Sequence, residues 1–180
     1  MVFGEKLLKR YENYNFSQKE FSTAEINIFG AEQTGGGNLP SSDVIDRRRK
    51  KVPDCINTLS KDGKLVGYYV LYPLNKTAVT KILKGELYNA KFLELQDIID
   101  AYEHADGLYI GMLVGTNTIA KALIATYMMQ DIAKKIDNHK TRYLFAKAGT
   151  AKGHKVIKEN NFTPIENSQI QFLDLQGLVL

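Results

Sequence analysis

The sequence has little cysteine and few long apolar runs, and each shortage excludes a class of protein. Its one cysteine, Cys55, cannot form an internal disulfide, so a disulfide framework is excluded and a reducing compartment is expected. No apolar run approaches the roughly 20 residues that a transmembrane helix needs. Residues 1–10 carry four charged side chains around a very short apolar stretch, which does not fit a signal peptide. We therefore expect a soluble, cytoplasmic protein without a membrane partner.

The sequence also lacks the residue patterns of two common catalytic sites, a zinc site and the nucleophile elbow of a serine hydrolase. The three histidines, His104, His139 and His154, are scattered without a His-x-x-x-His spacing, and there is only one cysteine to join them. A zinc site has little support from this set, and we expect no metal. No Gly-x-Ser-x-Gly motif occurs, so the nucleophile elbow of a serine hydrolase is absent from the sequence.

What is present is an ordinary globular composition. The chain has 180 residues, of which 44% are hydrophobic and 24% charged, so we expect one domain over residues 1–180 with one sizeable core. The net charge of +4 would attract a polyanionic ligand. That attraction does not distinguish a nucleic acid from a nucleotide cofactor.

Hydrophobic periodicity predicts the order of helices and strands. The clearest feature is a hairpin in which Asp62-Gly63 forms a two-residue turn, since both turn positions favour positive φ. The apolar run at 108–115 predicts a buried strand that leads directly into a long helix from Ile119 onward. The remaining predicted elements are a helix and turn at 7–21, a strand or helix fragment at 24–29, helices at 43–51, 76–87 and 150–159, hairpin strands at 55–60 and 65–74, and strands at 142–146 and 170–175.

This order has antiparallel strands early and a strand–helix–strand crossover late. It predicts an α/β fold with a mixed, mostly antiparallel central sheet and helices on both faces.

Three segments resemble the GCN5-related N-acetyltransferase (GNAT) superfamily. Residues 62–74, DGKLVGYYVLYPL, are similar to the family's "G-x-[IV]-[VI]-G-[YF]" hairpin. Residues 108–127 resemble its central strand and cofactor helix, and residues 142–162 resemble its later strand and helix, ending in Asn161-Phe162. The resemblance spans residues 54–175 and implies an acyl-CoA N-acyltransferase-like fold.

The resemblance implies acetyl-coenzyme A as co-substrate. Its pantetheine arm would pair with the strand at 109–114 as another strand would, beside a strand edge that the neighbouring strand at 142–146 leaves free. Its pyrophosphate would sit on the N-terminus of the following helix, where free N–H groups and the helix dipole favour an anion. The cofactor residues implied in this way are Met112, Leu113, Val114, Gly115, Thr116, Asn117, Thr118, Ile119 and Ala120.

Two positions depart from the family pattern. In the loop "[RQ]-x-x-G-x-[GA]" only Ala120 conforms, and Thr118 takes the place of the first glycine. Thr118 brings a Cβ toward the pyrophosphate, although its hydroxyl can donate to a phosphate. The tyrosine that the family uses to protonate the departing thiolate falls on Ile157, which has no hydroxyl.

Acetyl transfer to an amine needs a base, and an acidic segment supplies candidates. Residues 94–106 contain five acids and no Lys or Arg, a charge pattern that attracts a cationic amine. Glu94 or Glu103 is the candidate base; the alternative is that these acids form the solvated face of a helix. Tyr109 lines the acceptor pocket or is a core residue.

The run Arg47-Arg-Arg-Lys-Lys51 is the strongest local charge. It lacks interleaved aromatic residues, so a solvated helix face is the first interpretation, an anion or substrate contact the second and nucleic-acid binding the third. We expect no nucleic-acid partner.

The function predicted from these features is transfer of an acetyl group from acetyl-coenzyme A to a primary amine of a small molecule or a protein. The alternative is a non-catalytic GNAT-fold module that binds coenzyme A or a protein partner. The sequence leaves homodimer formation open.

Overall fold

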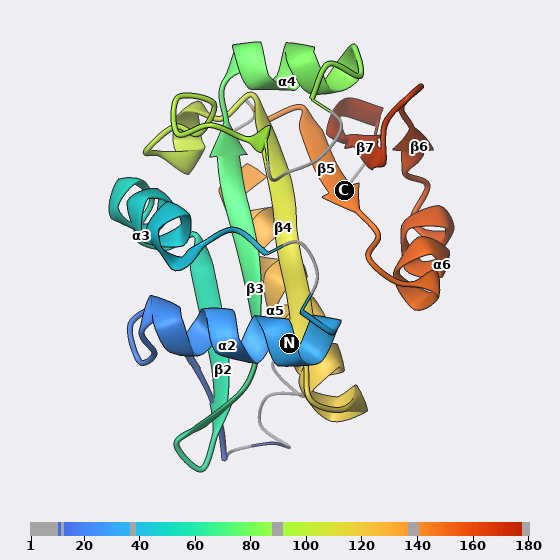
Figure 1. Cartoon of the computed structure of the whole chain (residues 1–180). Coiled ribbons are helices and arrows are strands. Elements are labelled where there is room, and N and C mark those ends of the chain that lie inside the picture. Colours follow the sequence, from blue (N-terminus) through green and yellow to red (C-terminus); the bar gives the residue numbers. More distant parts are fainter. Residues whose placement is uncertain (1–10, 12, 37–38, 88–91, 137–140, 178–180) are drawn as a thin grey trace. The chain divides into compact units, whose positions relative to one another are not determined.

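The computed structural model describes residues 11, 13–36, 39–87, 92–136 and 141–177. Figure 1 shows strands and helices in the order predicted for a mixed α/β protein. The strands are β1 (Tyr14–Ser17), β2 (Ile56–Lys61), β3 (Lys64–Leu74), β4 (Gly107–Gly115), β5 (Tyr143–Lys147), β6 (Thr163–Pro164) and β7 (Ile170–Asp174). The helices are α2 (Thr23–Thr34), α3 (Ser42–Lys51), α4 (Lys76–Leu83), α5 (Thr118–Ile136) and α6 (Ala151–Glu159), with short 3-10 turns η2 (Tyr102–His104) and η3 (Leu175–Gly177).

The strands form a mixed sheet with the order β1-β2-β3-β4-β5-β7-β6. The pairings β1–β2, β2–β3, β5–β7 and β6–β7 are antiparallel, while β4 and β5 pair in parallel. The predicted mixed, mostly antiparallel sheet is therefore confirmed. The predicted turn between β2 and β3 is also confirmed, because Asp62 and Gly63 have φ values of 51° and 72°.

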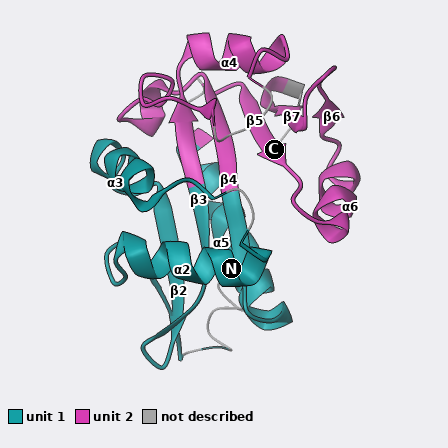
Figure 2. Ribbon diagram, viewed as in Figure 1, with its two compact units in different colours: residues 1–70, 112–135 teal, residues 71–111, 136–180 magenta. Residues whose placement is uncertain are grey.

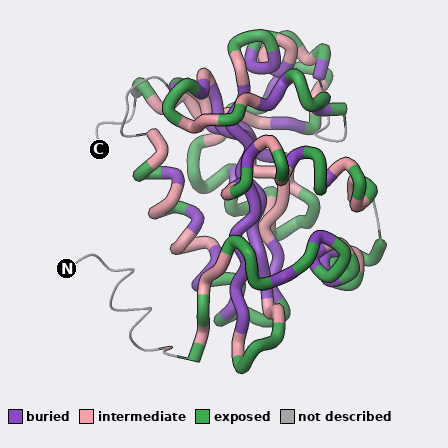
Figure 3. The backbone as a smooth tube through the Cα atoms, turned by 90° about the vertical axis from the view of Figure 1, so that its left-hand side faces the viewer, coloured by how far each residue is buried: buried purple, intermediate pink, exposed green. Residues whose placement is uncertain are grey.

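The chain divides into two compact units, which Figure 2 shows in separate colours. Unit 1 comprises Met1–Val70 and Met112–Lys135, and unit 2 comprises Leu71–Gly111 and Ile136–Leu180. The boundary falls within β3 and β4, so each of these strands contributes residues to both units. Figure 3 shows that long stretches of the strands are buried, and β3 is buried from Gly67 to its end.

In unit 1 the strands carry helices on both faces, as predicted. Successive side chains of a strand point to opposite faces, and β3 follows this rule. Tyr68 packs against Phe29 of α2 at a ring distance of 6.1 Å, whereas Tyr69 on the other face donates a hydrogen bond to Asp131 of α5 at 2.7 Å. Figure 1 accordingly shows α2 in front of these strands and α5 behind them.

Unit 2 contains the connection between β3 and β4 and the C-terminal strands. Helix α4 begins at an Asn75 cap, whose side-chain oxygen accepts a hydrogen bond from Ala78 N–H at 2.8 Å. The loop that follows α4 pairs with the end of β3 through a bridge between Leu74 and Ile98. This connection therefore has its own anchored structure.

The N-terminal part differs most from the prediction. Tyr14–Ser17 is a strand, so the predicted helix at 7–21 is wrong there; residues 7–10 and 12 lie outside the described residues. The segment 24–29 lies within α2, whose N-terminus is fixed by a capping box between Ser22 and Glu25. This Ser-x-x-Glu signal outweighs the short alternation of Ile26 and Ile28 that suggested a strand.

Candidate functional site

The N-terminus of helix α5 follows β4 after a two-residue turn in unit 1. Asn117 caps the helix, because its side-chain oxygen accepts a hydrogen bond from Ala120 N–H at 3.0 Å. Its backbone carbonyl accepts another from Lys121 N–H at 3.0 Å. The N–H groups of Thr118 and Ile119 have no intrahelical acceptor by helix geometry, and both residues are exposed. An anion at this turn would meet two backbone donors and the positive end of the helix dipole.

The nine predicted cofactor residues divide by burial along this junction. Val114, Gly115 and Ala120 are buried, Met112 and Leu113 are half-buried, and Thr116, Asn117, Thr118 and Ile119 are exposed. The four exposed residues are consecutive. A ligand can therefore reach the turn itself, while the flanking residues pack into unit 1.

Two glycines allow β3, β4 and α5 to approach closely at this point. A Cβ at Gly115 would lie 3.0 Å from the backbone nitrogen of Lys121, which is tighter than ordinary contacts. A Cβ at Gly67 of β3 would lie 2.6 Å from the Val114 carbonyl oxygen and would collide with the Ile124 side chain of α5. Any larger residue at Gly67 would therefore have to displace backbone as well as a side chain.

Strand β4 extends beyond its pairing with β5. The parallel register runs from Gly107–Tyr143 to Ile110–Ala146. Among the described residues, 111–115 have no partner in β5, although Thr116 N–H still donates to Val66 of β3 at 2.9 Å. Backbone groups along this part of β4 are available on one edge, as main-chain pairing with a ligand requires.

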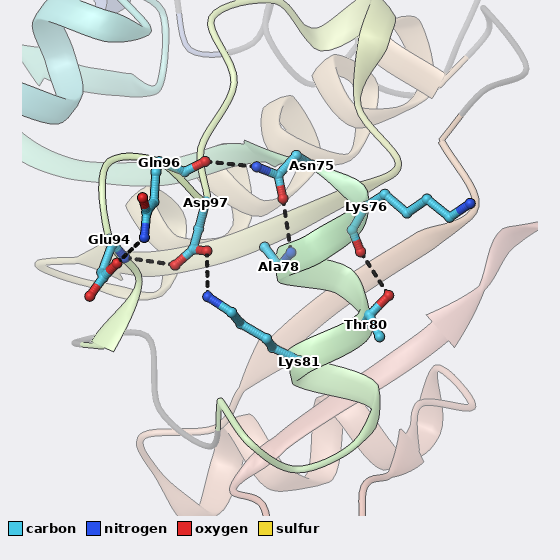
Figure 4. Close-up of polar contacts among 8 residues, drawn as sticks. All are labelled: Asn75, Lys76, Ala78, Thr80, Lys81, Glu94, Gln96 and Asp97. Atoms are coloured by element: carbon cyan, nitrogen blue, oxygen red, sulfur yellow. Dashed lines mark hydrogen bonds and ion pairs between the residues drawn. The ribbon is translucent and has the colours of Figure 1, made fainter.

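The acidic segment in unit 2 is organised around Asp97, as Figure 4 shows. The Asp97 carboxylate accepts hydrogen bonds from Lys81 Nζ at 3.2 Å and from Glu94 N–H at 2.9 Å, and the residue is only 2% exposed. The Gln96 side-chain amide donates to the Glu94 carboxylate, and the Gln96 carbonyl accepts from the Asn75 side chain at 2.7 Å. The segment is thus an anchored loop and not a helix. The interpretation as a solvated face is wrong for Asp97, which is buried and bound, whereas Glu94, Asp100 and Glu103 are exposed to solvent.

The three candidate catalytic residues all lie in unit 2. Glu94 is exposed in the anchored loop, and Glu103 is exposed in η2, where its carboxylate lies 3.8 Å from the His104 ring nitrogen. The structure therefore pairs Glu94 with Gln96 and Glu103 with His104. Tyr109 lies in β4 and is 1% exposed, so its ring is part of the core of unit 2.

This chain is similar to known proteins in its structure and not detectably in its sequence. No family model matches the sequence, and no curated protein matches it. The loading GNATL domain of CurA from Lyngbya majuscula superposes with a TM-score of 0.54 at 16% identity, over 75% of this chain and 64% of that chain. An agmatine N-acetyltransferase gives 0.54 at 11% identity, over 91% and 100%. The GNAT-like decarboxylase GphF, solved with isobutyryl-CoA, gives 0.53 at 12% identity, over 81% and 71%.

The chain has the GNAT fold. The resemblance stated from residues 62–74, 108–127 and 142–162 is thereby confirmed at the level of fold. At 11–16% identity these likenesses concern the path of the chain and not the chemistry of its side chains. This chain also spans just under two thirds of the CurA domain's length.

One departure from the GNAT pattern has a structural reason. Ile157, at the place of the family's tyrosine, is the one buried residue of α6, with 8% of its surface exposed. It anchors an otherwise exposed helix to unit 2. Its position serves packing, and it brings no hydroxyl for a leaving thiolate.

The basic run in α3 is not a uniform solvated face, so that prediction is wrong for two of its members. Arg48 is 3% exposed. Arg49 donates hydrogen bonds to the carbonyl oxygens of Phe21, at 3.0 Å, and of Gln18. The contacts of Arg48 and Arg49 therefore belong to the packing of unit 1, while Arg47 and Lys50 remain exposed charges.

Sequence reasoning missed a half-buried polar network at the far end of α5. Lys135 Nζ lies 2.8 Å from Asp54 and 3.3 Å from Asp131, which also accepts the Tyr69 hydroxyl hydrogen bond. Burial, followed by this hydrogen bond, raises the pKa of Tyr69 well above its usual range. The only sequence signal was the i,i+4 spacing of Asp131 and Lys135.

Within the described part of the chain, no three His, Cys, Asp or Glu side chains are grouped so that they could hold a metal ion. The same residues contain no helix with the length and apolar character needed to cross a bilayer.

Proposed function

We propose that this protein transfers an acetyl group from acetyl-coenzyme A to a primary amine of a small molecule or a protein. The observation that carries the proposal is the exposed turn at Asn117–Ile119, where two free backbone N–H groups follow the part of β4 that has no partner in β5, on a GNAT fold.

The chemistry of this junction fits an acyl-coenzyme A. The N–H groups of Thr118 and Ile119, with the Thr118 hydroxyl, would hold the pyrophosphate. Main-chain groups of residues 111–115 would pair with the pantetheine amides. A GNAT-like protein of the same fold was solved with isobutyryl-CoA, which supports an acyl-coenzyme A ligand here. When bound, acetyl-coenzyme A supplies the acetyl thioester.

Glu94 is the base in this proposal. A primary amine has a pKa near 10 and is cationic at neutral pH, so it must lose a proton before it can attack. The Glu94 carboxylate takes that proton directly or through water, and the neutral nitrogen then attacks. As the N–C bond forms and the C–S bond breaks, the nitrogen gives its second proton to water. Asp97 holds the Glu94 backbone N–H, and Gln96 holds its carboxylate. Because Ile157 has no hydroxyl, the departing thiolate takes its proton from water.

Glu103 as base is the alternative in the same unit, whereas Tyr109 is buried in the core and takes no part in the proposal. Calorimetry with acetyl-coenzyme A and free coenzyme A tests the cofactor site first. Thiol release with a panel of diamines and lysine peptides then tests transfer. We expect Glu94→Gln to reduce kcat at least tenfold, with Glu103→Gln as the matched exposed control. If the two variants behave in reverse, Glu103 is the base; if neither loses activity, neither is.

A non-catalytic module is the second candidate, and the buried Ile157 favours it. Such a module binds coenzyme A or a protein partner and transfers nothing. Coenzyme A binding without thiol release from any amine tested would support this second candidate over the enzyme.

We also propose a domain organisation, a location and a limit on the partners of this protein. We propose one domain over residues 1–180, because β3 and β4 contribute to both compact units. A cytoplasmic location is supported by the single, buried and unpaired Cys55. We propose that the protein has no nucleic-acid partner. In support, Arg49 donates hydrogen bonds to backbone carbonyl oxygens of the protein itself, so its guanidinium is not available to contact phosphates.

A further inference from the structure

The outward face of helix α5 carries no charge along its whole length. The buried residues Ala120, Leu123, Ile124, Met128 and Ile132 define the face that packs on unit 1. At 3.6 residues per turn, the opposite face is formed by other positions. The residues centred on that opposite face are Ile119, Ala122, Thr126, Met129, Ala133 and Ile136, flanked by Thr118, Ala125 and Gln130.

This outward face is accessible. Met129 is 53% exposed and Ile119 is 42% exposed, and Ala122 and Ala133 are exposed as well. A surface helix normally places its charged side chains opposite the core. In α5 the exposed charges, Lys121 and Lys134, lie on the two sides of the helix, roughly 110° from the centre of the outward face. The outward face therefore resembles a contact surface more than a solvated one.

The spacing of the face is that of helix pairing. Its six central residues follow one another at intervals of three, four, three, four and three, the a/d spacing of a helix that packs against another helix.

The order of these residues is also nearly the same in both directions. Read from either end, isoleucine comes first and alanine second, and Thr126 and Met129 occupy the middle. A two-fold axis through the helix centre would place Ile119 against Ile136 of a second copy, and Ala122 against Ala133. Small residues would then oppose each other and let the backbones approach, as an isologous interface requires.

We propose that α5 is a homodimer interface, in which the outward faces of two copies pack antiparallel about a two-fold axis. The electrostatics favour a second copy over other occupants. An acidic helix or an anionic membrane surface would be bound by cations within the face, and Lys121 and Lys134 lie outside it. Two uncharged faces can meet without burying an unpaired charge.

The size of the face predicts a reversible dimer. A helix of 19 residues is about 28 Å long, and one helix face of that length buries less than the roughly 800 Å² per partner of a standard interface. The interface therefore belongs to the weak, transient class. This inference does not depend on the proposed acetyl transfer.

Sedimentation equilibrium of the full chain from about 10 µM to about 1 mM tests the proposal. We expect the weight-average mass to rise with concentration toward twice that of the monomer. Met129→Glu places a charge at the centre of the face and should raise the dimer dissociation constant at least tenfold. Lys134→Glu, which places a carboxylate on the side of the same helix, should leave it within about twofold. Circular dichroism of both variants excludes unfolding as the cause.

The antiparallel register has its own test. Ala122→Glu and Ala133→Lys should each weaken the dimer. In a two-fold dimer each substitution places one unpaired charge in the interface from each of the two copies. An equimolar mixture of the two variants should dimerise again, because the introduced carboxylate of one copy then meets the introduced ammonium group of the other.

Several results would overturn the proposal. A wild-type chain that stays monomeric at about 1 mM contradicts it. So does a Met129→Glu variant that dimerises as the wild type does. Failure of the mixture to recover refutes the antiparallel register. Binding of the monomeric wild type to phosphatidylserine vesicles, lost in Met129→Glu, would assign the face to a membrane surface instead.

Discussion

Replacing Asn117 by aspartate should change stability and coenzyme A binding in opposite directions. The Asn117 side chain caps α5 through the Ala120 N–H at 3.0 Å, and aspartate is an equally good cap. A negative charge at a helix N-terminus adds about 0.3–1 kcal/mol to the free energy of unfolding. For a chain of this size we expect the melting temperature to rise by about 1–3 °C.

The same charge should repel a pyrophosphate bound at Thr118 and Ile119. Two unit charges about 5 Å apart interact by about 1–2 kcal/mol at the dielectric constants of an exposed site. Since 1.4 kcal/mol is a factor of ten, the dissociation constant for coenzyme A should rise roughly tenfold. The loss should shrink in high salt, which screens exposed charges.

Calorimetry with free coenzyme A and thermal unfolding of the unliganded protein measure the two quantities. Ser41→Asp is the control, because Ser41 occupies the N-cap of α3 and receives the same charge at another helix N-terminus in unit 1. It should leave coenzyme A binding unchanged. If Asn117→Asp also binds coenzyme A as tightly as the wild type, the pyrophosphate does not lie at α5, and the assignment of Thr118 and Ile119 falls.

Three further predictions concern Thr118, Gly67 and Cys55. Thr118→Gly should change the free energy of coenzyme A binding, measured by calorimetry, by about 1 kcal/mol. Tighter binding shows that the Thr118 Cβ obstructs the pyrophosphate, and weaker binding shows that the Thr118 hydroxyl donates to it. Unchanged binding argues against both. Gly67→Ala should lower the free energy of unfolding by about 1–3 kcal/mol in urea, because its Cβ would lie 2.6 Å from the Val114 carbonyl oxygen; a wild-type midpoint would contradict this. Burial raises the pKa of the Cys55 thiol from 9.0 to about 12, so above pH 9 the unfolded chain releases a proton that the folded chain keeps. Stability should therefore fall as pH rises from 9 to 11, and less steeply in Cys55→Ala; equal slopes would mean that the thiol is not protected.

The strands and helices that carry the fold were predictable because their signals are local. The apolar run at 108–115 and the helix after it correspond to β4 and α5, within one residue at their shared junction. The Asp62-Gly63 turn fixes the β2–β3 hairpin by backbone conformation alone. Such patterns need no information about distant partners.

The roles of charged residues were not predictable, since they depend on what folds over them. Arg48 and Asp97 look like members of exposed charge clusters in sequence, yet both are buried. The partner of Asp97 is Lys81, at 3.2 Å and on another element. Asn117 was included among the cofactor residues, but its role as the cap of α5 requires knowing where that helix begins.

The connection between β3 and β4 has a consequence for the order of folding. These strands are neighbours in the sheet, but α4 and the Asp97 loop separate them by about 30 residues, whereas two residues separate β2 from β3. Closing the longer connection costs on the order of 2 kcal/mol more chain entropy than closing the hairpin. The β2–β3 hairpin should therefore form early, and β4 should join it late. The hydrogen-bonded amides of Thr116 and Ala120, at the junction of β4 and α5, would then acquire protection from hydrogen exchange after those of the hairpin. The proposed cofactor turn would be among the last parts of unit 1 to form.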